Sequence, residues 1–216
     1  MNKKILAIIL VIMSTFFGTL MGMFLKIAQD EINVFTAGFL RFFLGLLIIF
    51  PYILYTKFKV YQSSHFKLHL LRGIINLPMM YLGFGALVYI SLEQFNALHF
   101  IVPLIVTLLA VLIFKERIYL IRISALIVGF LGMLIMIRPG IIEINIGVYM
   151  ILASCLMWSL IIIISKSLSK DESPITILTY QYTFMTVFTF FIALFYWETP
   201  SYTIWIYVFY NYFWLA

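Results

Sequence analysis

The chain has 216 residues, of which 65% are hydrophobic and 10% charged, and its formal net charge is +6. Soluble domains carry about 25% charged residues, so this chain has too little polar surface to cover a water-soluble fold. The composition therefore predicts an integral membrane protein. Nucleic acid is excluded as a partner, because the basic residues lie in short loops beside apolar runs, where they act as topology signals. The single cysteine, Cys155, excludes an intrachain disulfide.

Apolar runs long enough to cross a bilayer recur along the chain. A hydrocarbon core about 30 Å thick needs about 20 helical residues. Lipid satisfies no backbone hydrogen bond, and the sequence lacks the alternation typical of a barrel, so we expect an all-α, polytopic helical bundle. The expected spans are residues 5–26, 34–56, 70–90, 94–114, 119–138, 147–166 and 175–197, with an eighth from about residue 204 to Ala216.

Basic residues are distributed unevenly between the two sides of these spans. If the N-terminus is cytoplasmic, the outer loops hold only Lys26 and Arg138. The inner segments hold Lys3, Lys4, Lys57, Lys59, Lys67, Arg72, Lys115, Arg117, Arg122, Lys166 and Lys170. Because Lys and Arg concentrate in cytoplasmic loops, we expect a multi-pass protein of a bacterial inner membrane with a cytoplasmic N-terminus.

A segment of about fifty residues near the start aligns without a gap with a segment about 140 positions later. The matched landmarks are Ser14 and Ser154, Lys26 and Lys166, Glu31 and Asp171, Thr36 and Thr176, and Arg41 and Gln181. The first copy, residues 1–138, contains an odd number of spans, so the second, residues 147–216, is expected to be inverted. Inverted repeats belong mainly to transporters. A full second copy needs about 60 residues beyond Ala216, so we expect an incomplete second repeat.

The fourth span carries a polar stripe on one helical face. Its members are Glu93, Asn96, His99, Pro103 and Thr107. Polar side chains at membrane depth usually face a bundle interior or a watery cavity and mark a pathway. The alternative is that Glu93 is a solvated loop acid and His99 a packing residue. Pro103 is expected to kink the helix, either as a hinge or as a simple bend.

Two arginines lie near or inside the expected spans. Arg41 lies about 10 Å inside the second span, so it needs a partner or must snorkel. Glu93 is a candidate partner at the same membrane side. Arg72 and Asn76 share a face of the third span; we interpret Arg72 as an interface anchor and Asn76 as a candidate pathway residue.

The second repeat adds two pathway candidates, Trp158 and Gln181. Trp158 shares a face with Ser154 and Ser165, a pattern that is usually helix packing and sometimes a cavity wall. Four glycines are expected at close helix contacts: Gly18, Gly22, Gly129 and Gly132.

No chemistry-bearing motif accompanies these residues. His65 and His69 are four apart but lack Cys or acidic neighbours in the sequence, so we predict no metal site. No P-loop, H-E-x-x-H or G-x-S-x-G pattern occurs, and we expect neither an enzyme nor a cofactor.

Several short, loosely defined motifs follow one another along the chain in a characteristic order. They are Phe39-Leu40-Arg41-Phe42-Phe43, Leu71-Arg72-Gly73, Phe84-Gly85-Ala86-Leu87-Val88-Tyr89-Ile90, Pro103, Lys115-Glu116-Arg117, and Leu126 to Gly132 with its two glycines. In these motifs the chain resembles the drug/metabolite transporter superfamily, in particular its ten-span EamA-type members. The resemblance covers the first repeat well and the second weakly. It implies two inverted five-helix repeats, cytoplasmic termini, and a small-molecule exporter or exchanger without a nucleotide motor.

The leading functional hypothesis is a secondary transporter of a small metabolite or drug-like solute. Its partners are then the solute, the lipid bilayer, and either protons, through Glu93 or His99, or a counter-solute. The alternative is a non-transporting remnant or membrane scaffold, suggested by the incomplete second repeat. The sequence leaves the solute and the oligomeric state open.

Overall fold

The computed structural model describes residues 31–115, 120–137 and 145–200, together with positions 6, 8, 9, 12, 13, 15, 16, 19, 20 and 23. Much of the expected first span at 5–26, Gly18, Gly22 and the expected eighth span lie outside the described residues.

The described residues form helices and no strand. In chain order these are α2 (Val34–Tyr55), a 3₁₀-helix η1 (Lys59–Tyr61), α3 (Phe66–Tyr89), α4 (Leu92–His99), α5 (Ile101–Phe114), α6 (Leu120–Ile137), α7 (Ile146–Leu168) and α8 (Pro174–Ala193). Within the described chain, five stretches are long and apolar enough to cross a membrane: α2, α3, α4 with α5, α7 and α8. The prediction of an all-α polytopic membrane protein is confirmed.

The span boundaries differ from the sequence expectation at three places. Helix α3 begins at Phe66 rather than 70, and α8 ends at Ala193 rather than 197. The expected span at 94–114 is interrupted at Phe100. Pro103 lies three residues later and cannot donate a hydrogen bond to the carbonyl of His99, which explains why the helical ladder breaks here.

Short polar side chains set the helix starts. The side chain of Asn33 accepts from the Thr36 amide at 2.9 Å at the start of α2. Ser91 and Gln94 form a reciprocal capping box at α4. Ser173 caps α8, whose first residue is Pro174. Such caps satisfy amide groups that have no partner within the helix, so they favour a helix start at these positions; α3 and α5 begin without a side-chain cap.

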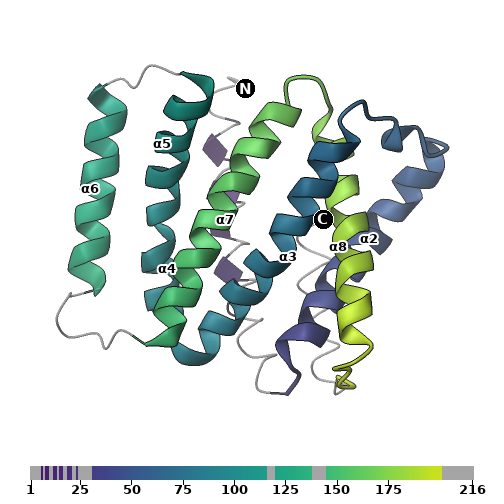
Figure 1. The fold of residues 1–216 in the computed structure, drawn as a ribbon, viewed down its shortest axis with the longest axis horizontal. Helices are drawn as coiled ribbons and strands as arrows, with labels where there is room; N and C mark the ends of the chain where they lie inside the picture. Colours follow the sequence, from purple (N-terminus) through teal and green to yellow (C-terminus); the bar gives the residue numbers. More distant parts are fainter. Residues whose placement is uncertain are drawn as a thin grey trace.

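Helices α2 and α8 pack side by side in opposite directions (Figure 1). The ring of Phe39 lies 5.6 Å from Phe190, and the ring of Phe42 lies 5.8 Å from Tyr182, so residue numbers rise along one helix as they fall along the other. These two helices contain the matched segments of the expected repeats. Their opposite directions are those that an inverted repeat requires.

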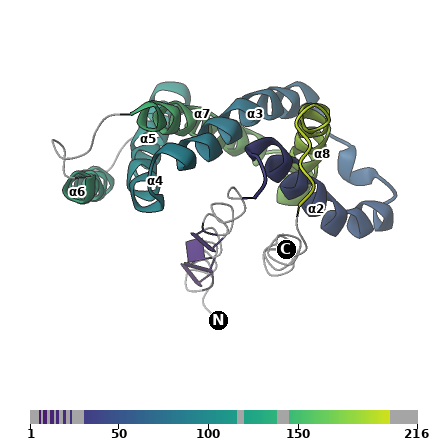
Figure 2. The ribbon, with the colours of Figure 1, turned by 90° about the horizontal axis from the view of Figure 1, so that it is seen from below.

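Helices of the two expected repeats alternate across the molecule (Figures 1 and 2). Helix α7 packs between α5 and α3, and α8 packs between α3 and α2. The bundle therefore has no separate core for each repeat, and the main seams lie between repeats.

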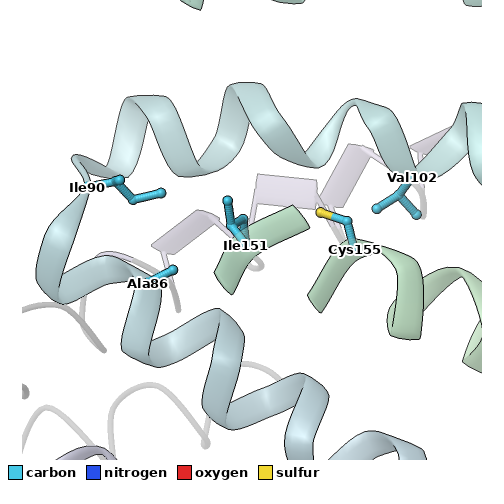
Figure 3. Close-up of a cluster of buried hydrophobic side chains, with 5 residues drawn as sticks. All are labelled: Ala86, Ile90, Val102, Ile151 and Cys155. Atoms are coloured by element: carbon cyan, nitrogen blue, oxygen red, sulfur yellow. The ribbon is translucent and has the colours of Figure 1, made fainter. Parts of the chain in front are cut away.

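Buried apolar side chains fill these seams. One cluster joins the end of α3, α5 and α7 and consists of Ala86, Ile90, Val102, Ile151 and Cys155 (Figure 3). A second joins α2, α3 and α8 and consists of Phe42, Met80, Phe84 and Met185. The second cluster also forms part of the cavity described below.

Close helix contacts occur at glycines other than those expected. Among the described residues, a Cβ at Gly129 or Gly132 meets no atom within 4 Å, so these two glycines of α6 mark no contact with a described helix, contrary to expectation. The sequence shows which face of α6 carries small residues, but it does not show which face packs against a neighbouring helix. At Gly45 of α2, in contrast, a Cβ overlaps the ring of Tyr182.

The substitution Gly45→Ala is expected to lower the free energy of unfolding by about 1–3 kcal/mol, because the added methyl group displaces the Tyr182 ring from the α2–α8 seam. The matched control Gly129→Ala adds the same group to a helix in open space and should stabilise by about 0.5–1 kcal/mol. Thermal unfolding in detergent measures both. Equal effects of the two substitutions would contradict the described α2–α8 packing.

Candidate functional site

A cavity of about 310 Å³ lies in the middle of the bundle. Side chains from α2, α3, α4, α7 and α8 line it: Arg41, Phe42, Asn76, Met79, Met80, Gly83, Phe84, Phe95, His99, Ser154, Trp158, Ile161, Ile162, Ser165 and Gln181. Sites for small molecules are usually mostly apolar, with a few placed polar groups and volumes from about 300 Å³ upward. The composition and size of this cavity match that description.

The cavity brings matched positions of the two repeats together. Arg41 of α2 and Gln181 of α8 both line it and are 140 positions apart, as in the repeat alignment. In inverted-repeat transporters the solute site lies at the interface of the repeats. The cavity occupies the corresponding place in this fold.

The structure brings five of the eight pathway candidates into this cavity: Arg41, Asn76, His99, Trp158 and Gln181. The other three lie elsewhere. Glu93 and Asn96 are exposed in α4, and Thr107 is buried in α5 but does not line the cavity. The expected single polar face on the fourth span is therefore wrong. The interruption at Phe100 bears only on Thr107, which lies beyond it in α5; Glu93 and Asn96 share the helix of His99, and their exposure shows that this part of the α4 face points away from the cavity.

Arg41 contacts aromatic rings rather than an acid. Its guanidinium carbon lies 5.3 Å from the centroid of Phe84 and 5.5 Å from that of Phe42. These are cation–π distances. The expected pair with Glu93 is not formed, and the Glu93 carboxylate instead lies 3.5 Å from the Ser91 hydroxyl. Rings on α2 and α3 thus hold the guanidinium plane at the cavity wall.

The imidazole of His99 is oriented by its own helix and by α7. Nδ1 lies 3.1 Å from the carbonyl oxygen of Phe95, and the ring meets Trp158 edge to face at 6.3 Å. A carbonyl only accepts, so Nδ1 carries the proton in this hydrogen bond. In the neutral ring, Nε2 is then left as an acceptor.

Asn76 lines the cavity and holds a buried amide donor without a described partner. Its side chain is 2% exposed, and within the described chain Nδ2 has no hydrogen-bond partner. A buried amide without a partner costs about 1–3 kcal/mol, so this donor favours a polar occupant. By contrast, the nearby hydroxyl of Ser154 donates to the Met79 carbonyl at 2.8 Å and serves to join α7 to α3.

Arg72 is buried inside the bundle and is not an interface anchor, contrary to the sequence interpretation. It is 2% exposed. Its guanidinium donates to the Gln181 side-chain oxygen at 2.5 Å and to the Ile177 carbonyl at 2.9 Å. A weaker contact of 3.4 Å reaches Ser165. Arg72 therefore fixes Gln181, a cavity residue, from the side away from the cavity.

Two histidine–carboxylate pairs join α3 to the loop between α7 and α8. His69 lies 2.6 Å from Glu172, which also accepts from the Ser63 hydroxyl. His65 lies 3.3 Å from Asp171. We call the end of the bundle where these pairs lie the basic end, because it also holds Lys57, Lys59, Lys67 and Lys170.

The sequence reading of these histidines needs correction, because their acidic neighbours come from residues about 100 positions away. One feature of the sequence does indicate that these histidines face other helices. Positions 65, 69, 72 and 76 follow the four-three-four spacing of one helical face, so a continuous polar face on α3 was predictable. In the described part of the chain, no group of three or more metal-ligating side chains gathers.

The carboxylate of Glu172 is held in its charged form. Burial by itself raises its pKa, but hydrogen bonds from Ser63 and His69 and the nearby imidazoles outweigh that effect and lower the pKa below the usual 4.5. The side chain is 6% exposed. Folding therefore stabilises the ionised form of this group.

The substitution Glu172→Gln should lower the free energy of unfolding by about 1–3 kcal/mol near neutral pH, since it removes charge from two hydrogen bonds. A group with a lowered pKa stabilises the fold above its unfolded pKa and loses this contribution as the pH falls through its folded value. The difference from wild type should therefore shrink only below the usual 4.5. Unfolding in detergent as a function of pH measures it.

The matched control is Asp171→Asn, in the more exposed neighbouring pair, with an expected effect of at most about 1 kcal/mol. A Glu172→Gln effect that is no larger than the control, or independent of pH, would show that the pair does not hold α3 to the loop.

Comparison of the sequence with known proteins identifies the family of this chain. The sequence model of the EamA-like transporter family matches residues 5–138 and 145–213. The chain is 26% identical over 176 residues to an S-adenosylmethionine uptake transporter of Rickettsia prowazekii, covering 82% of this chain and 60% of the relative. It is 26% identical over 174 residues to a riboflavin transporter of Vibrio cholerae, covering 79% and 58%. The chain thus spans about 60% of the length of these relatives. It belongs to the EamA-like transporter family.

Proposed function

We propose that the protein is a secondary transporter that carries a small metabolite through the cavity between its two repeats. One observation carries this proposal: Arg41 and Gln181, matched positions on antiparallel helices, both line one cavity. A site shared by two inverted repeats can be exposed to either side when one repeat rocks against the other. The sequence has no P-loop, so the gradient of a solute or ion is the proposed source of energy.

The proposed solute has a flat ring. Relatives are named for S-adenosylmethionine and riboflavin, both of which contain a flat heteroaromatic ring system. Phe95 and Trp158 provide aromatic surfaces in the cavity wall. Stacking on such surfaces suits a flat ring of any detailed structure. His99 provides an acceptor beside them and is the proposed titratable group if transport is coupled to protons, in place of the exposed Glu93.

The basic end is proposed to face the cytoplasm, following the distribution of Lys and Arg. In the described conformation the His69–Glu172 and His65–Asp171 pairs join α3 to the α7–α8 loop at that end. Solute exit on this side then requires the pairs to separate. The His65–Asp171 pair is exposed and separates at little cost, whereas the His69–Glu172 pair is buried, so breaking it carries most of the cost of opening this end.

Flux measurements test the transport proposal. In proteoliposomes with riboflavin and S-adenosylmethionine as first solutes, Trp158→Ala and His99→Ala should each lower flux per inserted molecule at least about tenfold, which corresponds to about 1.4 kcal/mol of lost binding. Glu93→Gln is the matched control, because its side chain is exposed and away from the cavity, and it should retain flux. Absence of flux for any solute from folded protein would favour the scaffold alternative.

Cysteine labelling tests the orientation. In a Cys155→Ser background, Ser64→Cys places an exposed thiol at the basic end and Thr199→Cys one at the opposite end. An impermeant maleimide should label only Thr199→Cys in intact cells, and both after permeabilisation. Labelling of Ser64→Cys in intact cells would reverse the proposed orientation.

A further inference from the structure

We propose that the cavity selects solutes that carry an anionic group, carboxylate or phosphate, and that Arg41 and Asn76 bind this group. This inference rests on the proposed transport function and names the solute class of the same cavity. It goes beyond the flat ring argued above, because it concerns the charge of the solute.

The first support is the charge of the cavity wall. Arg41 is its cation, and no Asp or Glu of the described residues lines it. Four of the acids described elsewhere have assigned places. Glu172 and Asp171 pair with histidines at the basic end, Glu93 is exposed, and Glu198 accepts from the Asn33 amide. A cation at membrane depth without an anion loses hydration that neutral neighbours only partly replace. A bound anion offsets that cost.

A second cation lies just behind the wall. Arg72 is buried, and its hydrogen-bond partners Ser165, Ile177 and Gln181 are neutral; the Glu172 carboxylate interacts with it electrostatically and offsets part of its charge. Two of these partners, Ser165 and Gln181, are themselves cavity residues. The field of Arg72 therefore adds to that of Arg41 at the site, and a low-dielectric wall strengthens both.

The third support is the pair of free donors. The Arg41 guanidinium is positioned by ring contacts with Phe42 and Phe84, and among the described residues no carbonyl or carboxylate accepts from it. Stacking leaves the edge of the guanidinium plane available, and that edge binds carboxylate or phosphate with two parallel hydrogen bonds. The unpartnered Asn76 Nδ2 in the same cavity supplies a further donor. Donors without matching acidic groups suit an anion and not a cation.

This charge pattern distinguishes the cavity from one built for a cationic solute. S-adenosylmethionine, for which four relatives are named, carries a sulfonium and an ammonium group besides its carboxylate. A site for it needs an acidic or aromatic partner for each cation. Here no described acid lines the wall, and two of its aromatic rings, Phe42 and Phe84, already face the Arg41 guanidinium, so only Phe95 and Trp158 remain for two cations beside a fixed positive charge. We therefore infer a preference for net-anionic solutes over S-adenosylmethionine.

The test compares solutes that share a ring and differ in charge. Binding to the whole protein in lipid nanodiscs is measured for phenylacetate against phenylacetamide, and for riboflavin monophosphate against riboflavin. The first pair reports a carboxylate and the second a phosphate. At least one anionic member should bind about tenfold or more tightly than its neutral counterpart, and added salt should reduce this advantage. Equal affinities within both pairs would overturn the inference.

Variants then assign the preference to its residues. Arg41→Gln should lower affinity for the preferred anion about tenfold and change that for its neutral counterpart less than about twofold, whereas Arg41→Lys should retain part of the preference. Asn76→Leu removes the second donor while keeping a similar side-chain volume, and it should also lower the affinity for the anion. Lys59→Gln is the control, because it removes one positive charge from an exposed position outside the cavity.

An Arg41→Gln variant that folds and keeps the full preference for the anion would also overturn the inference. If that variant does not fold, the Asn76→Leu result and the salt dependence of the wild type decide. Normal flux with no charge preference leaves the transport proposal standing and removes this one. Absence of flux in the wild type removes the transport proposal instead.

Discussion

The hydrogen bonds of Arg72 are the constraint on which the arrangement of α3 and α8 depends. A guanidinium this deeply buried is costly unless its donors find acceptors, and the available acceptors are the Ile177 carbonyl and the Gln181 side chain on α8. These bonds fix both the distance and the rotation of α8 relative to α3. Helix α2 then packs on α8, so the position of Arg41 at the cavity follows from the same contact.

The polar face of α3 links the cavity to the basic end of the bundle. Along it, Asn76 lines the cavity, Arg72 reaches α8, and His69 reaches the α7–α8 loop. His69 also stacks on Tyr180 at 4.2 Å, so the same loop and helix hold it from two directions. Any rotation of α3 against α7 and α8 must exchange these partners together. In the proposed transport cycle, opening of the basic end therefore involves the same helix face that lines the cavity.

The residues at the cavity show what could be predicted and where prediction stopped. Arg41 and Gln181 were identifiable as matched polar positions inside apolar runs, and the structure places both at the cavity. Glu93 had an equally strong sequence argument, yet it is exposed. Arg72 looked like an interface residue because it stands near the start of its span, and only the partners on α8 show it to be buried. Whether such a residue is buried or exposed depends on the neighbouring helix, and the spacing of residues along one helix gives no information about that neighbour.

The sequence by itself determined the elements that the bilayer dictates: which segments are helices, and roughly where α2 and α7 begin and end. Bilayer thickness and the need to satisfy every backbone group act on each segment separately, so these features can be read locally. The tertiary structure alone decided which face of each helix meets which neighbour. It brought Glu172 to His69 and left Gly129 without a close neighbour among the described residues. Those choices depend on the packing of side chains far apart in the chain, and a local pattern carries no information about a helix's rotation against its neighbours.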